Sequence, residues 1–362
     1  MITGEYYKII YLIIVTLCTL SCYNKYYHTR GDVIIKDSSG KAFILALILA
    51  FFIGMRPIGD MFGDSVGYAD YFNRLKKNSF SYTLDTENLI FDNLLAWMAS
   101  LGYSINTFFL ICALIYFLCR YWSCKKMFPN NTWAAYLFFL ASFITYASSV
   151  NGFKAGAAAS LFCVAIAYNN DKRWWMIPLF LALSVGFHHA MHVCIAAYIT
   201  CYFFKNTKIY LAFWIFSLIC AITHISYFQV LFAGLTDEKG AEYLITDGRN
   251  GWLTGMRYDF VIYSSMPVLF GWYIKFKKKI EIQGYSFVLN LYLLLNGIWM
   301  LCMYASFTNR IAALSWFMYA IVLGYPLLHG NKVFTFNKNK TLATIMILHL
   351  AFSLFMAFIY YA

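Results

Sequence analysis

Residues 42–68 of the chain read AFILALILAFFIGM and then RPIGDMFGDSVGY. The first fourteen residues carry no charge, and the run stops at Arg56, after which a proline, three glycines and two aspartates follow within twelve residues. A continuous apolar run of this kind predicts a helix surrounded by protein or lipid, and Pro57 and the glycines predict its end. The same pattern recurs along the whole chain and decides the fold class.

Eleven further apolar runs lie at residues 6–23, 104–120, 132–150, 152–168, 174–187, 190–204, 208–224, 259–276, 285–305, 308–328 and 341–361. Of the 362 residues, 62% are apolar and 12% are charged, whereas soluble domains are about 45–50% apolar and ~25% charged. This composition excludes a soluble enzyme. Because strands of a membrane barrel alternate in segments of about 10 residues, we predict an all-α polytopic transmembrane helical bundle of about 12 spans, forming a single multi-pass membrane domain over residues 1–362.

The cysteines carry no signal for a disulfide framework or a zinc site. Nine of the ten lie in apolar runs, Cys124 falls in a predicted loop, and no C-x-x-C motif occurs. We expect them to be small buried side chains.

Charge predicts the topology. Eighteen of the 28 Lys and Arg residues, Arg120 among them, fall in one alternating set of short loops, which gives that face a formal charge of +14 and the other face −2. Lys and Arg accumulate in cytoplasmic loops. We therefore predict the cytoplasmic (inner) membrane as the location, with both termini and any active face toward the periplasm or exterior. No nucleic-acid partner is expected, because the basic residues are spread over six short loops.

The two long connections, residues 56–103 and 225–258, fall on the outer face in this topology. Residues 89–98 within the first are apolar on one helical face but too short to span, so we expect a helix lying in the membrane interface. Chemistry is expected on this face, because functional residues concentrate in long loops.

The segment after residue 55 combines groups suited to phosphate and to proton transfer. Arg56 can bind phosphate oxygens with two parallel hydrogen bonds, and Asp60 or Asp64 can accept a proton from a hydroxyl. Tyr68 closes the segment. An interfacial loop with a snorkelling arginine and a helix-capping aspartate is the structural alternative.

A second candidate is the helix start at Asn151-Gly152-Phe153-Lys154. Asn151 can cap the helix, and Lys154 lies near the positive helix end, where an anion is favoured. The small residues that follow are explained by close helix packing, and snorkelling is the alternative for Lys154.

Histidines form a third candidate, in the sequence Phe187-His188-His189-Ala190-Met191-His192. His188 and His189 could act as acid or base or contact phosphate, or they could be hydrogen-bonded interfacial residues. His188 and His192 have metal-ligand spacing, but no acidic residue or cysteine nearby completes a site.

Further charges lie late in the chain. Arg257 and Asp259 stand at the start of a span and could pair with each other or with the first long loop. Asn309 and Arg310 lie between two other spans. Residues 236–239 and 246–252 add polar and aromatic groups of the kinds that bind sugars, but ordinary loop polarity would explain most of this pattern. The cations Arg56, Lys154, Arg257 and Arg310 gather on the face that should lack them, which favours a polyanionic head group such as a lipid diphosphate.

With these stretches in order, the chain resembles the EpsG-like family of Wzy-type polysaccharide polymerases. The resemblance rests on Arg56, Gly59, Asp60, Asp64 and Tyr68, on Asn151, on His188 and His189, on Arg257-Tyr258-Asp259-Phe260, and on Asn309-Arg310. The family's helix opening is similar to Asn-x-x-Arg-Gln, and here Lys154 and Ala155 replace the last two residues, so a bidentate grip becomes a point charge. The outer loops are also similar at the level of fold to the GT-C glycosyltransferases.

The resemblance implies a glycosyltransferase that moves a glycan chain from polyprenyl diphosphate onto a hydroxyl of an incoming lipid-linked repeat unit, building exopolysaccharide, capsule or O-antigen. Arg56, Arg257, Arg310 and Lys154 would hold the diphosphate, and Asp64, Asp60, His188 or His189 would take the proton. No metal and no cofactor is implied. Partners would be undecaprenyl-diphosphate oligosaccharide, membrane lipid, a chain-length regulator and export proteins. A flippase of lipid-linked oligosaccharide, a membrane acyltransferase and a non-catalytic assembly component are the alternatives.

Overall fold

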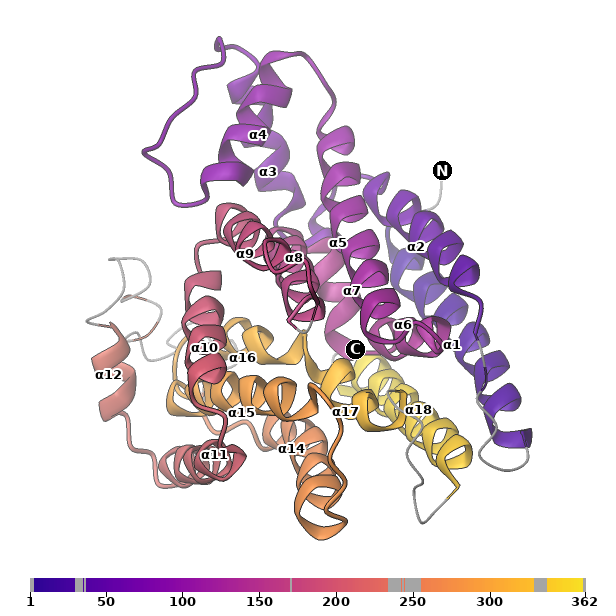
Figure 1. The fold of residues 1–362 in the computed structure, drawn as a ribbon. Coiled ribbons are helices and arrows are strands. Elements are labelled where there is room, and N and C mark those ends of the chain that lie inside the picture. The colour runs from indigo at the N-terminus through magenta and orange to yellow at the C-terminus, as the bar shows by residue number, and fades with distance from the viewer. Residues whose placement is uncertain are drawn as a thin grey trace. The chain divides into compact units, whose positions relative to one another are not determined.

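The computed structural model describes residues 3–29, 35, 37–169, 171–233, 242, 244, 255–328 and 337–360. Every regular element within these residues is a helix (Figure 1). The chain divides into two compact units, residues 1–191 with 327–362 (unit 1) and residues 192–326 (unit 2). A single membrane domain over the whole chain stays a prediction.

Unit 1 is built around helix α5. Its elements are α1 (Glu5–His28), α2 (Ser39–Gly54), the 3-10 turn η1 (Asp60–Phe62), α3 (Ser65–Leu75), α4 (Leu89–Ser100), α5 (Ile105–Met127), α6 (Thr132–Leu140), α7 (Phe143–Val150), α8 (Phe153–Ala167), α9 (Met176–Phe187), α18 (Lys338–Phe355) and the π turn η3 (Met356–Tyr360). Helix α5 packs against α2 and α8, α8 packs against α9, and α1 packs against α18 (Figure 1).

The two ends of α5 define the two ends of unit 1. Its 23 residues extend about 35 Å at 1.5 Å per residue, enough to cross the ~30 Å hydrocarbon core of a bilayer. At its start, Asn106 Nδ2 donates to the Arg56 carbonyl at 2.7 Å. At its other end, Lys126 forms an ion pair with Asp171, in the loop that follows α8.

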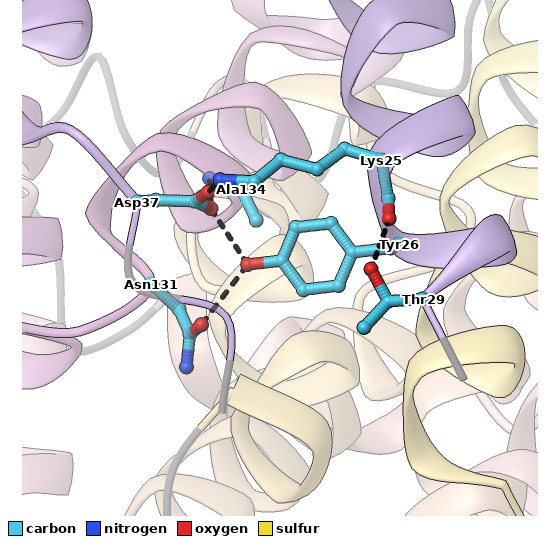
Figure 2. Close-up of polar contacts among 6 residues, drawn as sticks. All are labelled: Lys25, Tyr26, Thr29, Asp37, Asn131 and Ala134. Carbon is cyan, nitrogen blue, oxygen red and sulfur yellow. Dashed lines mark hydrogen bonds and ion pairs between the residues drawn. The ribbon is translucent and has the colours of Figure 1, made fainter. Parts of the chain in front are cut away.

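A buried carboxylate fixes the end of unit 1 opposite Arg56 (Figure 2). Asp37, whose side chain is 1% exposed, accepts from Lys25 Nζ at 2.8 Å and from the Tyr26 hydroxyl at 2.6 Å. The backbone N–H of Asp37 donates to the Asn130 carbonyl at 2.8 Å, and the Ala134 N–H reaches the carboxylate at 3.4 Å. Asp37 thereby joins the end of α1, the start of α2 and the start of α6.

Unit 2 comprises α10 (Met191–Phe203), α11 (Thr207–Ile222), α12 (Tyr227–Ala233), α14 (Tyr258–Trp272), the π turn η2 (Tyr273–Lys277), α15 (Tyr285–Leu301), α16 (Thr308–Trp316) and α17 (Tyr319–Leu328), whose last two residues are assigned to unit 1. Helix α15 packs against α11 and α16. Buried Asn296 of α15 ties them together: its Oδ1 accepts from Trp214 Nε1 at 2.8 Å and its Nδ2 donates to Ser315 Oγ at 3.0 Å.

Each of the twelve apolar runs contains at least one helix in its described residues, which confirms a membrane helical protein but not twelve spans. Within the described residues, four helical stretches are long and apolar enough to cross a bilayer alone, namely Glu5–His28, Ile105–Met127, Thr308–Leu328 and Lys338–Phe358. The pair α6 and α7, bent by 73°, would make a fifth, and seven shorter apolar helices remain. The count of twelve stays a prediction.

Two assignments at the end of α5 are wrong. The sequence placed Arg120 and Cys124 in a loop, yet both are buried inside α5. Arg120 donates from Nε to Ser160 Oγ at 3.2 Å and from Nη1 to Cys163 Sγ at 2.8 Å, both on α8. Because these partners accept hydrogen bonds from the buried guanidinium, Arg120 can lie inside the helix, which continues to Met127.

Candidate functional site

The polar segment after α2 is held against the turn between α7 and α8. Gly63 has a φ of +60°, and an added Cβ there would lie 2.3 Å from Asn151 Oδ1. The same Oδ1 accepts the backbone N–H of Asp64 at 3.2 Å. Asp60 and Asp64 are both exposed. Two segments nearly ninety residues apart in sequence are therefore in contact, with both candidate carboxylates accessible.

Arg56 is buried directly beneath this contact. Its side chain is 1% exposed, and its guanidinium donates to the carbonyls of Ile53 at 3.0 Å and Val150 at 2.8 Å. The guanidinium carbon lies 4.5 Å from the ring centre of Phe109. No carboxylate pairs with Arg56 among the residues that the structure describes. The sequence prediction of direct phosphate binding by Arg56 stays a prediction.

Lys154 and Tyr68 share one group of aromatic rings. The ammonium of half-buried Lys154 lies 5.5 Å from the centre of the Phe91 ring on α4. Tyr68 of α3 meets the Phe153 ring edge-on, with centres 4.9 Å apart, and Phe91 and Phe153 lie 6.0 Å apart. This aromatic group fixes the first turn of α8, where free backbone N–H groups already favour an anion.

The histidine pair joins the same region through α4. Helix α9 ends at Phe187, whose ring lies 6.2 Å from that of Phe91. His188 and His189 follow, both half-buried, with ring centres 5.1 Å apart. The His189 N–H donates to Asn88 Oδ1 at 3.1 Å, and His189 Nδ1 lies 3.9 Å from the Glu87 carboxylate. A carboxylate near a histidine can hold its ring for proton transfer.

The structure thus brings the unit 1 candidates together. They share the end of the unit where α5 begins, linked through the contacts of Asn106, Asn151 and Phe91. These candidates are Arg56, Asp60, Asp64, Tyr68, Asn151, Lys154, His188 and His189. Exposed carboxylates, a cation at a helix start and a histidine pair can bind an anion and accept a proton.

In unit 2, Arg257 pairs with Asp259, one of the two arrangements that the sequence left open. Nε donates to Oδ1 at 2.9 Å and Nη2 to Oδ2 at 2.6 Å. The guanidinium carbon lies 3.8 Å from the Phe260 ring centre, and Arg257 is 8% exposed. The ion pair orients the guanidinium at the start of α14.

Asn309 and Arg310 occupy the first turn of α16. Trp299 Nε1 donates to Thr308 Oγ1 at 2.9 Å, which fixes this turn to α15. The preceding residue, Phe307, has a φ of +52°, a region that bulky residues rarely adopt. Arg310 is exposed and lies 4.7 Å from the Phe307 ring. Asn309 Oδ1 is buried and has no hydrogen-bond partner within the described part of the chain.

That Arg56, Arg257 and Arg310 bind one ligand together stays a prediction, because Arg56 belongs to unit 1 and the other two residues to unit 2. Residues 236–239 and 246–252, whose polar and aromatic groups could suit sugars, lie outside the described residues. Among the described residues, no group of three His, Cys, Asp or Glu side chains could hold a metal ion.

Sequence reasoning missed several residues that shape the site. Glu87 and Asn88 contact His189, and no local pattern distinguishes them from other loop residues. His349 could have been found, because an ionisable residue inside an apolar run is unusual. It is buried in α18, with Nε2 3.1 Å from the Phe138 carbonyl.

No curated protein and no solved structure matches the chain. The family model that does match covers residues 42–362 and is that of the EpsG family. The match takes in every candidate residue of both units, as well as the apolar helices that follow α1. On this match over most of its length, the chain is a membrane protein of polysaccharide biosynthesis that belongs to the EpsG family.

Proposed function

We propose that the protein is a polysaccharide polymerase that transfers a polyprenyl-diphosphate-linked glycan chain onto a hydroxyl of an incoming lipid-linked repeat unit. The observation that carries this proposal is the contact of the Gly63–Asp64 backbone with Asn151, which places an exposed carboxylate beside the cationic start of α8. Membership of the EpsG family supplies the polysaccharide context.

The reaction is a substitution at the anomeric carbon. A bond forms from the acceptor hydroxyl oxygen to this carbon, and the bond from the carbon to the diphosphate oxygen breaks. Asp64 accepts the hydroxyl proton in our assignment, with Asp60 and the His188–His189 pair as alternatives. The polyprenyl diphosphate leaves as an anion, which needs nearby cations and no proton.

Lys154 and the N–H groups at the start of α8 are the unit 1 groups that we assign to the diphosphate. Lys154 is half-buried above Phe91, where its charge is less screened than in bulk water. Arg257, Arg310 and Asn309 of unit 2 are likewise proposed to bind the diphosphate. We assign Tyr68 to substrate contact, and we assign Asp259 to the orientation of Arg257.

The orientation in the membrane follows from charge. Lys25, Lys126 and Arg173 lie at the end of unit 1 that also holds Asp37 and Asp171, opposite the candidate site. The excess of basic residues at that end supports a cytoplasmic position for it, with the site facing the exterior of the cytoplasmic membrane. Twelve spans and a GT-C-like arrangement with interfacial helices α3 and α4 are parts of this proposal.

The test uses purified protein in lipid nanodiscs, supplied with repeat units on polyprenyl diphosphate alone, with the products separated on a gel. We expect a ladder of polymers, reduced about 10–100-fold in Lys154→Ala, the effect of one lost charge-assisted contact. Lys25→Ala, a cation at the opposite end, is the matched control and should leave the ladder unchanged. Comparing the ladders of Asp64→Asn and Asp60→Asn identifies the base, because only the variant that lacks the base should lose elongation. Unchanged ladders in Lys154→Ala and Arg257→Ala would contradict the assigned roles.

A flippase is the second candidate, and two observations favour it. Arg120 lies about 22 Å along α5, at 1.5 Å per residue from Ile105, and α6 and α7 form a broken helix pair. Buried charges and broken helices are common in transporters. Transbilayer movement of labelled lipid in liposomes without elongation would favour the flippase over the polymerase.

A further inference from the structure

The break between α6 and α7 is enclosed by side chains that satisfy its backbone. Residues 141 and 142 separate the two helices, whose axes differ by 73°. The N–H groups of Ala141 and Ser142 donate to the carbonyls of Leu137 and Phe139 at 2.8 and 3.1 Å. Within a bilayer each carbonyl left unpaired at the break would cost several kcal/mol. Tyr11 donates to the Leu140 carbonyl at 2.7 Å, and Thr145 Oγ1 donates to the Phe139 carbonyl at 2.7 Å.

A second set of contacts completes this enclosure. His349 Nε2 lies 3.1 Å from the Phe138 carbonyl and 3.3 Å from Ser142 Oγ, and the Tyr116 hydroxyl donates to the Thr145 carbonyl at 3.1 Å. Groups from α1, α5 and α18 therefore hold the bend in one place. A bend fixed by so many contacts sets the direction of α7 and the position of its last residue, Val150.

Arg56 holds the other end of α7. One guanidinium nitrogen donates to the Val150 carbonyl and another to Ile53 on α2, while Asn106 fixes the Arg56 backbone. The residue after Val150 is Asn151, which opens the turn that leads to Lys154. Arg56 is 1% exposed, so a dissolved anion cannot reach its guanidinium in this structure.

We propose that Arg56 is a positioning residue: it ties the end of α7 to α2 and so fixes the Asn151–Lys154 turn that receives the lipid diphosphate. The choice of ligand rests on the proposed function, whereas the tie itself does not. A guanidinium suits this task because its fork reaches two carbonyls at once, and a lysine ammonium would serve only one of them well.

The test places a reporter on the turn in protein that holds no substrate. Gly152 is exposed, and a Cβ there would meet only the Ser148 Cα at 3.7 Å, so Gly152→Cys can carry a spin label. Eight native cysteines are buried and two are half-buried, and the same labelling without Gly152→Cys measures their background. We expect an immobile label that becomes mobile in Arg56→Gln and stays immobile in Lys154→Ala.

Kinetics of the elongation reaction give the second readout. A misplaced turn moves Lys154 away from the leaving diphosphate, so Arg56→Gln should lower kcat about 100-fold, and Arg56→Lys should recover part of kcat. Direct binding of the diphosphate by Arg56 predicts the same loss of kcat with the label still immobile. An immobile label in Arg56→Gln together with lost elongation would overturn the positioning role and restore direct binding.

Two further measurements separate failure of the positioning role from failure of the proposed function. If Arg56→Gln does not fold, Asn106→Ala removes the contact to the Arg56 backbone and should mobilise the same label. If the wild-type protein makes no ladder, the proposed function fails, yet the label still decides whether Arg56 holds the turn. An immobile label in both variants contradicts the tie whatever the reaction proves to be.

Discussion

Replacing Gly63 by alanine tests whether the contact between the first polar segment and Asn151 is part of the working site. The backbone at Gly63 has φ +60° and ψ −122°, a combination that costs a side chain roughly 1–3 kcal/mol. The added methyl group would also lie 2.3 Å from Asn151 Oδ1. The carboxamide must then move and release the Asp64 N–H, whose hydrogen bond is worth about 1 kcal/mol. Together these effects predict that Gly63→Ala lowers the free energy of unfolding by about 2–4 kcal/mol.

Gly59 provides the matched control on the other side of η1. Its φ is 177°, an extended conformation open to any residue, and no heavy atom lies within 4 Å of an added Cβ. Gly59→Ala should therefore change stability by less than about 0.5 kcal/mol. The double variant Gly63→Ala/Asn151→Ala removes the clash and should be less destabilised than the sum of the single variants, because contacting residues are not additive.

The assay combines thermal unfolding in nanodiscs with the ladder experiment. We expect Gly63→Ala to lower the unfolding midpoint by at least about 2 °C and to reduce elongation about 10–100-fold, because the turn that carries Lys154 is displaced. Gly59→Ala should match the wild type in both. If Gly63→Ala behaves like Gly59→Ala in midpoint and in rate, the contact does not hold the site together and the reasoning is refuted.

Three further predictions concern stability elsewhere in the chain. Asp37→Ala should cost about 2–4 kcal/mol because it removes the buried acceptor that Lys25, Tyr26 and the Ala134 N–H share, whereas Lys25→Ala, 49% exposed, should cost less than about 1 kcal/mol; equal losses in chemical unfolding would contradict the burial argument. The Lys126 ammonium and the Arg173 N–H hold the pKa of Asp171 well below its usual range. The contribution of Asp171 to the stability of the folded protein is therefore complete above the ordinary pKa of about 4. This contribution is lost as the pH falls through the lower pKa of Asp171 in the folded protein. The unfolding midpoint of the wild type should fall more than that of Asp171→Asn between pH 5 and pH 3, and parallel curves would rule this out. In unit 2, Asn296→Ala should cost about 2–3 kcal/mol by leaving the Trp214 N–H unpaired, and an unchanged midpoint would show that water replaces the amide.

The helices could be predicted from the sequence because long apolar runs leave few alternatives to a helix in lipid. Their ends could not always be predicted. The run at 104–120 appeared to stop at Arg120, and only Ser160 and Cys163, forty residues away, explain why α5 continues. A local pattern contains no information about such partners.

The broken helix was missed for the same reason. Residues 132–150 read as one span, and neither proline nor glycine marks the bend after Leu140. The bend depends on donors from other helices, above all Tyr11 and His349. Sequence propensity cannot report a conformation that tertiary contacts impose.

The unit 1 candidates could be grouped from the sequence, but their surroundings could not be predicted. The predicted alternation of spans puts the starts of α5 and α8 and the end of α9 on one predicted face, which is enough to group Asn151 with His188. That Arg56 is buried while Asp64 is exposed depends on packing against Phe109 and Phe153. Chemistry read from residue types therefore assigned Arg56 and Lys154 the same role, although their surroundings differ.

The packing of α1 against α18 has a consequence for how the protein is made. These two helices are neighbours although about three hundred residues separate them in sequence, so α1 cannot meet its partner until α18 has been synthesised. The Phe138 carbonyl, which His349 of α18 contacts, lacks that contact for the same interval. Unit 1 is consequently completed only once residues 338–355 have been made, and a chain cut short before residue 338 would offer quality-control proteases an unfinished bundle.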